Sequence, residues 1–166
     1  FHAPTRGLMG YTSRFLTLTK GTGVINRIFH GYGKFEGEMD GRKNGALISM
    51  ATGKAVAFAI FNLQARGEMF VTHNDPVYEG MIVGLAPKAG DMIINVMKGK
   101  QLTNMRTQGT DENVVLTPVR QMSIAEQLSM LNTDEALEIT PKSLRLRKAI
   151  LNPNDRKKNE KSGTPL

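Results

Sequence analysis

The feature that most constrains this chain is a cluster of five glycines within fifteen residues: Gly31, Gly33, Gly37, Gly41 and Gly45. Glycines at this density interrupt regular elements, so we expect a loop here, and the best candidate for a domain boundary. Before it, the pattern predicts one helix over residues 5–18, ended by Gly21, and one strand over residues 23–30. A lone strand cannot form a sheet, and the first residue is Phe1 rather than Met. The N-terminal part therefore reads as the second half of an α+β domain, and the chain as a piece of a longer polypeptide.

Short helices and strands of an α/β (α+β) domain are predicted after the glycines. Apolar patterns predict helices over residues 54–63 and 123–131, the second opened by a capping box of Ser123 and Glu126, and a last helix from Asn152. Strands are predicted over residues 46–50, 69–72, 81–85, 91–97, 114–116, 137–140 and 143–147. We expect mixed, mostly antiparallel sheets in three segments: an incomplete half-domain (1–38), the main domain (39–150), and a basic tail with a short helix and a disordered end (151–166).

Positive charge is concentrated at the two ends of the chain, whose net charge is +7 at pH 7. Residues 1–35 hold five bases and no acid, residues 36–141 hold nine bases and thirteen acids, and residues 142–166 hold eight bases and two acids. Basic segments favour a polyanionic partner, because neutralising phosphates releases counterions. A solubilising tail explains the same charges equally well.

Residue types and spacings argue against several kinds of site. Cysteine is absent, which removes disulfides, thiolate metal sites and a cysteine nucleophile, and fits a reducing compartment. A phosphate-binding P-loop fails at Ile48, where glycine is required, and at Ala55, which lacks the hydroxyl. The three histidines share no metal-ligand spacing. One enzyme alternative stays open, a small hydrolase using His73, Asp75 and Glu79, although a polar turn explains these residues as well.

A long polar segment, residues 98–109, is the strongest candidate for a binding site. It has three bases, two glycines and no acid, and loops longer than about twelve residues are usually functional or disordered. As an RNA-binding segment, its bases can pair with phosphates, and its polar side chains can reach base edges or 2′-hydroxyls. The alternative is a mobile surface loop without a binding role. The bases are Lys98, Lys100 and Arg106, and the polar side chains are Gln101, Thr103 and Asn104.

A second basic stripe is predicted at residues 143–148. Side chains alternate along a strand, so Arg145 and Arg147 share one face, and Leu144 and Leu146 share the other. With the neighbouring Lys148, this stripe suits RNA contact. Edge strands also carry lysine and arginine to discourage aggregation, so a solvated edge is an equal alternative.

Several short motifs, spread over nearly the whole chain, resemble one family. They are Ala3-Pro4-Thr5-Arg6-Gly7-Leu8, Gly21-Thr22-Gly23, Asn44-Gly45, Leu47-Ile48-Ser49, Gly53-Lys54-Ala55, Leu63-Gln64 with Arg66-Gly67, Val77-Tyr78-Glu79-Gly80-Met81-Ile82, Leu102-Thr103-Asn104-Met105-Arg106, Gly109-Thr110-Asp111-Glu112, and Thr140-Pro141 with Ser143 and Arg145. In combination they resemble the C-terminal part of the TypA/BipA family, translational GTPases related to elongation factor G.

The resemblance implies a non-catalytic piece of a ribosome-docking protein. Residues 1–38 would end a ferredoxin-like fifth domain, and residues 39–150 would form the family-specific C-terminal domain. GTP and Mg²⁺ would bind a domain outside this chain. One loop of the family contacts large-subunit ribosomal RNA and the acceptor arm of A-site tRNA, and the segment that matches it is residues 98–110. The residues expected to bind RNA are Lys98, Lys100, Thr103, Asn104, Met105, Arg106 and Thr107, with Arg145, Arg147 and Lys148 as auxiliary phosphate contacts.

The remaining expectations concern location and partners. We expect a cytoplasmic protein with no DNA partner, no metal or cofactor in this chain, and no membrane partner, since no run of eighteen apolar residues occurs. A protein–protein adaptor is the alternative function, and an apolar surface patch away from the basic loop would favour it. The sequence leaves the oligomeric state open.

Overall fold

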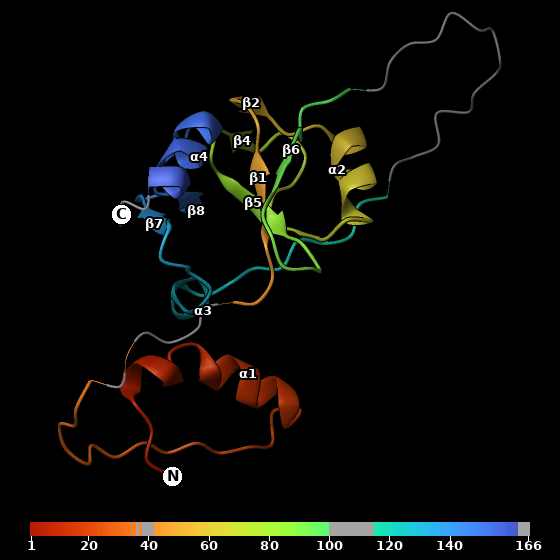
Figure 1. Cartoon of the computed structure of the whole chain (residues 1–166). Helices are drawn as coiled ribbons and strands as arrows, with labels where there is room; N and C mark the ends of the chain where they lie inside the picture. Colours follow the sequence, from red (N-terminus) through yellow and green to blue (C-terminus); the bar gives the residue numbers. More distant parts are fainter. Residues whose placement is uncertain (36, 38–41, 100–114, 163–166) are drawn as a thin grey trace, which may run out of the picture. The chain divides into compact units, whose positions relative to one another are not determined.

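The computed structural model describes residues 1–35, 37, 42–99 and 115–162, and the chain falls into two compact units (Figure 1). Unit 1 comprises residues 1–42 and 122–133, and unit 2 comprises residues 43–121 and 134–166. Short helices are combined with mostly antiparallel sheets, so the predicted fold class is confirmed. The expected domain boundaries after residues 38 and 150 stay predictions, and the end expected to be disordered, residues 163–166, lies outside the described residues.

Unit 1 contains a 3₁₀ helix, η1 (Thr5–Leu8), helix α1 (Tyr11–Leu18) and helix α3 (Ile124–Ser129). The single helix predicted over residues 5–18 is therefore broken, because Gly10 takes a left-handed φ of 71° just before α1. A Cβ atom at Gly10 would lie 2.5 Å from Ser129 Oγ, so glycine is required for this close approach to α3. After α1, Gly21 ends the helical region with a φ of 80°, as the sequence predicts.

The strand predicted over residues 23–30 is wrong. None of these residues belongs to a strand, and Val24, Ile28 and Phe29 are exposed by 81%, 92% and 74%. A strand needs a hydrogen-bonded neighbour, and the described residues of unit 1 contain no strand that could pair with this segment. High β-propensity is not enough to form a sheet without that neighbour.

Unit 2 is built on a four-stranded sheet in the order β3-β5-β1-β6. These strands are β1 (Ala46–Ser49), β3 (Glu68–Met69), β5 (Ile82–Leu85) and β6 (Met92–Ile94). Strand β5 pairs antiparallel with β1 and β3, whereas β6 pairs parallel with β1. All four residues of β1 are buried, as expected for a central strand that is covered on both faces.

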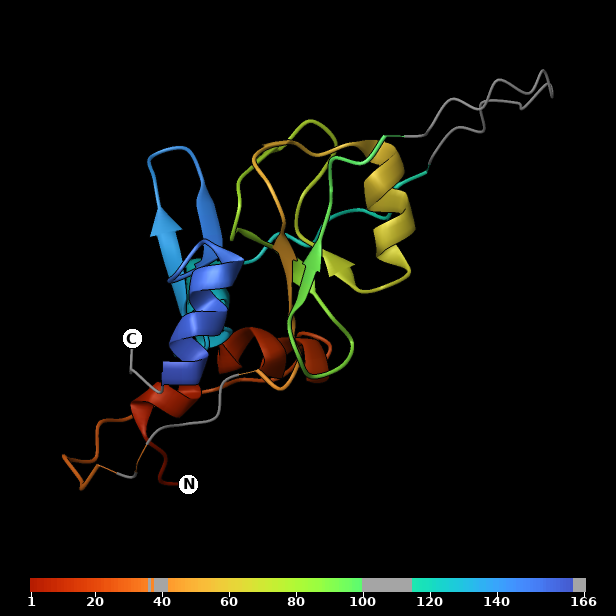
Figure 2. The same cartoon turned by 45° about the horizontal axis from the view of Figure 1, so that its top comes forward.

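The two faces of this sheet are covered by different elements. Helix α2 (Ala57–Gln64) lies on one side, and the hairpin of β7 (Glu135–Ile139) and β8 (Leu144–Lys148) lies on the other (Figures 1 and 2). Ile60 of α2 joins Leu47 and Val83 of the sheet in the main hydrophobic cluster. The helix begins later than the sequence predicts, because β2 (Gly53–Lys54) pairs with β4 (Pro76–Val77) instead.

The C-terminal elements agree best with the sequence. Strands β7 and β8 are predicted to within about two residues, and α4 (Pro153–Ser162) is the expected basic helix. The strand predicted over residues 114–116 is not found, because Val115 and Leu116 belong to no strand, and Val114 lies outside the described residues. In the part of the chain that the structure describes, no helix is both long enough and apolar enough to cross a membrane.

Candidate nucleic-acid interface

The chain leading into residues 98–110 is buried just before this segment begins. Beyond β6 the chain continues to Val96, which is fully buried and whose carbonyl accepts a hydrogen bond from Val56 N at 2.9 Å. Lys98, two residues further on, is exposed. It is the one predicted RNA-binding residue of the loop that the structure describes. The others lie outside the described residues: Lys100, Thr103, Asn104, Met105, Arg106 and Thr107.

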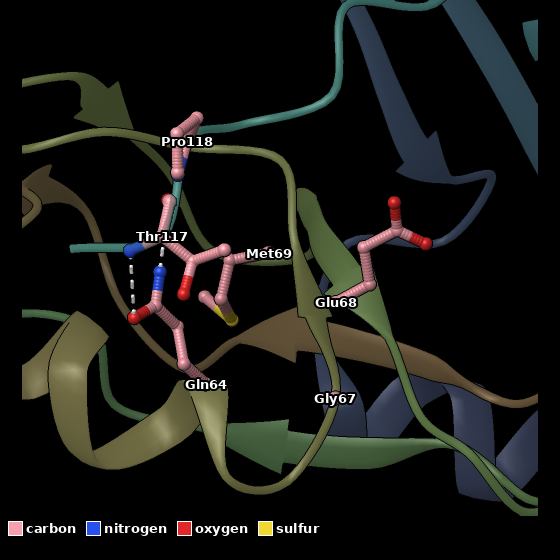
Figure 3. A pocket seen from close by; sticks show the side chains of 6 residues that line it. All are labelled: Gln64, Gly67, Glu68, Met69, Thr117 and Pro118. Atoms are coloured by element: carbon pink, nitrogen blue, oxygen red, sulfur yellow. Dashed lines mark hydrogen bonds between the residues drawn. The ribbon is translucent and has the colours of Figure 1, made fainter.

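The chain returning from the loop is held by a side-chain clamp. Leu116 packs against the hydrophobic core of unit 2. Gln64 Nε2 donates a hydrogen bond to Thr117 O at 3.1 Å, and Thr117 N donates one to Gln64 Oε1 at 3.2 Å (Figure 3). The amide of Gln64 therefore satisfies both backbone groups of Thr117, as a partner strand would.

Gln64 is the residue that sequence reasoning missed. The Leu63-Gln64 motif contributes to the family resemblance, but no role follows from the motif alone. The local signal for Gln64 is its position at the C-terminal end of an apolar helix. There its side-chain amide, which has both a donor and an acceptor, can reach another segment of the chain.

A pocket of about 330 Å³ lies beside the clamp. It is lined by Gln64, Gly67, Glu68, Met69, Thr117 and Pro118 (Figure 3). Among these lining residues, Glu68 is the one charged residue. Gln64 and Thr117 line the pocket and also form the clamp, so the two features share a place in the fold.

The β7–β8 hairpin orients two of the predicted auxiliary contacts. Arg145 lies opposite Glu138 in the hairpin register, and its Nη1 is 3.5 Å from Glu138 Oε1. Arg147 Nη1 donates to the carbonyls of Lys148 and Ala149 at 3.1 and 3.4 Å. Both arginines are half-buried, and both are held by Nη1 in these contacts. A guanidinium has five N–H donors, so contacts of this kind leave capacity for phosphate.

Tyr78 completes the network around Glu138. Tyr78 Oη donates a hydrogen bond to Glu138 Oε2 at 2.6 Å. Burial, and then this bond to a carboxylate, raise the pKa of Tyr78 from 10.0 to about 12. The phenol therefore stays a neutral donor over the physiological range, and Glu138 is held between Tyr78 and Arg145.

Lys148 differs from the two arginines. It is 2% exposed, and its Nζ lies 2.5 Å from Asp91, 2.6 Å from Asp134 and 2.9 Å from Glu135. Burial disfavours the ammonium, but the hydrogen bonds to these carboxylates outweigh it and raise the pKa of Lys148 above its ordinary value. Position 148 is two residues from the buried Leu146, so strand alternation directs it to the core side. Lys148 therefore joins the hairpin to its neighbours and does not face solvent.

The residues of the hydrolase alternative serve a helix start and a turn. His73 Nδ1 accepts from Ala57 N at 3.2 Å, at the beginning of α2. Asp75 Oδ2 accepts from Thr72 N at 2.7 Å. Both side chains are thus engaged in local backbone contacts, and Glu79 N donates to Thr52 Oγ1 at 3.3 Å. Across residues 1–35, 37, 42–99 and 115–162, no group of three or more His, Asp or Glu residues is arranged to hold a metal ion.

These features define a class of protein: a small mixed α/β domain whose sequence carries a basic, acid-free segment, residues 98–110, after the edge strand of its sheet. Residues 44–153 match the TypA/BipA C-terminal domain. The chain therefore belongs to the TypA/BipA family, and the resemblance found in the sequence is confirmed.

Three relatives illustrate the similarity, and each is named a large ribosomal subunit assembly factor BipA. The protein of Buchnera aphidicola (from Schizaphis graminum) is 47% identical over 163 residues, which is 98% of this chain and 27% of the relative. The Salmonella typhimurium protein is 47% identical over 93% of this chain and 26% of its own length. The Haemophilus influenzae protein is 43% identical over 97% of this chain and 26% of its own length. The chain thus spans about a quarter of the length of the curated relatives it matches.

Proposed function

We propose that this chain docks on the large ribosomal subunit as the C-terminal region of a translational GTPase. The family match and the names of the relatives support the ribosome as the partner. The observation that carries the proposal is the acid-free basic loop 98–110, whose departure point is buried at Val96 and whose return is clamped at Thr117. Anchors of this kind reduce the conformational freedom that the loop loses when it binds RNA.

In this proposal the loop contacts large-subunit ribosomal RNA and the acceptor arm of A-site tRNA. Cationic side chains supply affinity through phosphates, and the polar side chains between them approach sugars or bases. The phosphate contacts are Lys98, Lys100 and Arg106, and the sugar or base contacts are Thr103, Asn104, Met105 and Thr107. On the hairpin, Arg145 and Arg147 are auxiliary phosphate contacts. Lys148 is left out, because its ammonium is buried among three carboxylates.

The chemistry of the parent protein belongs elsewhere in this proposal. GTP and Mg²⁺ would bind a separate domain, and the present chain would contribute docking without a catalytic residue. A ribosome partner also places the protein in the cytoplasm.

The adaptor alternative is favoured by one observation, the exposed apolar residues of unit 1. Val24, Ile28, Phe29 and Tyr32 are between 74% and 99% exposed. We assign them to the incomplete ferredoxin-like half, where strands from the rest of the parent would cover them. An adaptor surface would keep them exposed in the full-length protein, which limited proteolysis of that protein can test.

The experiment that tests the proposal is co-sedimentation of the chain with purified large ribosomal subunits across a salt series. The test variant is K98A/K100A/R106A, and the control is K34A/K88A/K142A, which removes three exposed lysines outside the loop. We expect the loop variant to bind more weakly than the control, with a salt slope that falls by roughly 0.7 to 0.9 for each lost phosphate contact. Equal binding by the two variants would contradict the loop assignment.

A further inference from the structure

Helix α4 forms without burying any of its residues. Its N-terminus is well capped, because Asn152 Oδ1 accepts from Asn154 N at 2.9 Å and from Asp155 N at 3.4 Å. Pro153 occupies the first helical position, where its missing N–H is harmless. A ten-residue helix is marginal by itself, and this one has no apolar face for the core. Its position therefore has to be fixed by polar contacts.

Two arginines fix the segment that leads into α4. Arg147 Nη1 donates to the carbonyls of residues 148 and 149, and Arg156 Nη1 donates to those of residues 150 and 151, at 3.0 and 2.6 Å. Four consecutive carbonyls are thus bound, from the end of β8 to the start of the helix. Helix α4 accordingly lies beside the β7–β8 hairpin (Figures 1 and 2).

This attachment turns three lysines outward. A helix advances about 100° per residue, so Lys157, Lys158 and Lys161 fall within an arc of about 100°. All three are exposed, whereas Arg156 and Asn159 are half-buried on the opposite side. The two acids of the helix flank the arc. Asp155 Oδ1 lies 3.6 Å from Lys158 Nζ in an exposed ion pair, and Glu160 lies on the other flank. The outer face of α4 is therefore a strip with a net positive charge, which we call the lysine arc.

We infer that the lysine arc of α4 is a second RNA-binding surface, which pairs with backbone phosphates independently of the 98–110 loop. The inference rests on the proposed function for its choice of polyanion. Lysine is a flexible point charge that suits phosphates without demanding a particular base. A membrane surface fits less well, because interfacial helices need an apolar face, and α4 has none.

The test is binding of the whole chain to a short fluorescein-labelled RNA duplex, followed by fluorescence anisotropy across a salt series. The variants are K157A/K158A/K161A, the loop variant K98A/K100A/R106A, and the dispersed control K34A/K88A/K142A. Alanine favours helix, and circular dichroism checks that α4 is retained. Each of the three variants loses three positive charges. A difference in RNA affinity between them therefore reports where the charges lie and not the net charge.

We expect the arc variant to lose at least about tenfold in affinity relative to the control, and its salt slope to become shallower by roughly 2 to 3. Binding equal to that of the control would overturn the inference and make α4 a solvated helix. The inference would also be overturned if the arc variant lost affinity for anionic phospholipid vesicles and not for RNA. If only the loop variant loses affinity, the proposed function stands and the arc fails; if only the arc variant does, the loop assignment fails and the arc stands.

Discussion

At the scale of single residues, burial decides what each base of the hairpin can do. Arg145, Arg147 and Lys148 are neighbours in the sequence, yet only Lys148 is enclosed by carboxylates. The side chain of Glu135 in that cluster is 0% exposed, and the Lys148 ammonium offsets part of the cost of burying its charge. Such a cluster is sensitive to the loss of a single partner, because an unpaired buried charge is much less stable than a paired one.

Replacing Lys148 with Met should therefore destabilise unit 2 strongly. We expect a loss of about 3 kcal/mol in the free energy of unfolding, at the low end of the range for broken buried pairs, because Asp91 and Asp134 remain partly hydrated. Urea unfolding measures it. Lys142→Met, at an exposed position, is the control and should change stability by no more than about 0.5 kcal/mol. Equal stabilities of the two variants would show that the cluster does not hold the hairpin.

Tyr78 gives a prediction at alkaline pH. Its pKa is raised to about 12 in the folded protein, above the ordinary 10.0, so the neutral phenol is favoured by folding. The stability gained from Tyr78 should be complete below pH 10 and lost as the pH rises towards 12. Comparing urea unfolding of the wild type and Tyr78→Phe across this window isolates the effect. An ultraviolet titration in which the tyrosinate signal removed by Tyr78→Phe appears near pH 10 would contradict the assignment.

At the scale of elements, the sequence predicts features set by nearby residues better than features that depend on distant parts of the chain. Ser123 Oγ accepts from Glu126 N at 3.3 Å, which confirms the cap of α3 that the sequence indicates. The alternation of side chains along the β7–β8 hairpin is equally predictable, because both strands and their turn are contiguous in the chain. The break in the helix at Gly10 is not predictable in this way, because Gly10 packs closely against Ser129, more than a hundred residues away. The same limit applies to the segment 23–30, whose state depends on a neighbouring strand.

The clamp between α2 and the returning chain gives a prediction for one element contact. Gln64→Ala removes both bonds to the backbone of Thr117, so the amide hydrogen of Thr117 should exchange with solvent faster. Each such bond is worth about 1 kcal/mol, so the loss of both should accelerate exchange by roughly 30-fold. Asn62→Ala is the control, because Asn62 Nδ2 donates to Phe58 O within α2. Unchanged exchange at Thr117 would mean that the loop is anchored by other contacts.

At the scale of the whole molecule, the charge pattern and the family resemblance select the same segment, the 98–110 loop. The middle of the sequence is acidic overall, yet the 98–110 loop within it has three bases and no acid. The sequence could therefore select the loop, and the described structure adds its two anchors. It could not predict that α4 lies beside the hairpin and buries none of its residues, because a lysine-rich helix looks the same in sequence whether it is docked or free.

The most direct test of the central claim uses the absence of cysteine from this chain. A single cysteine introduced by Asn104→Cys can carry a tethered iron chelate that cleaves nearby RNA, and the cuts are mapped on large ribosomal subunits by primer extension. Lys88→Cys, at an exposed site outside the loop, is the matched control. We expect cuts from position 104 to cluster in large-subunit RNA beside the acceptor arm of A-site tRNA. Bound protein that cuts there from position 88 and not from position 104 would contradict docking through the loop.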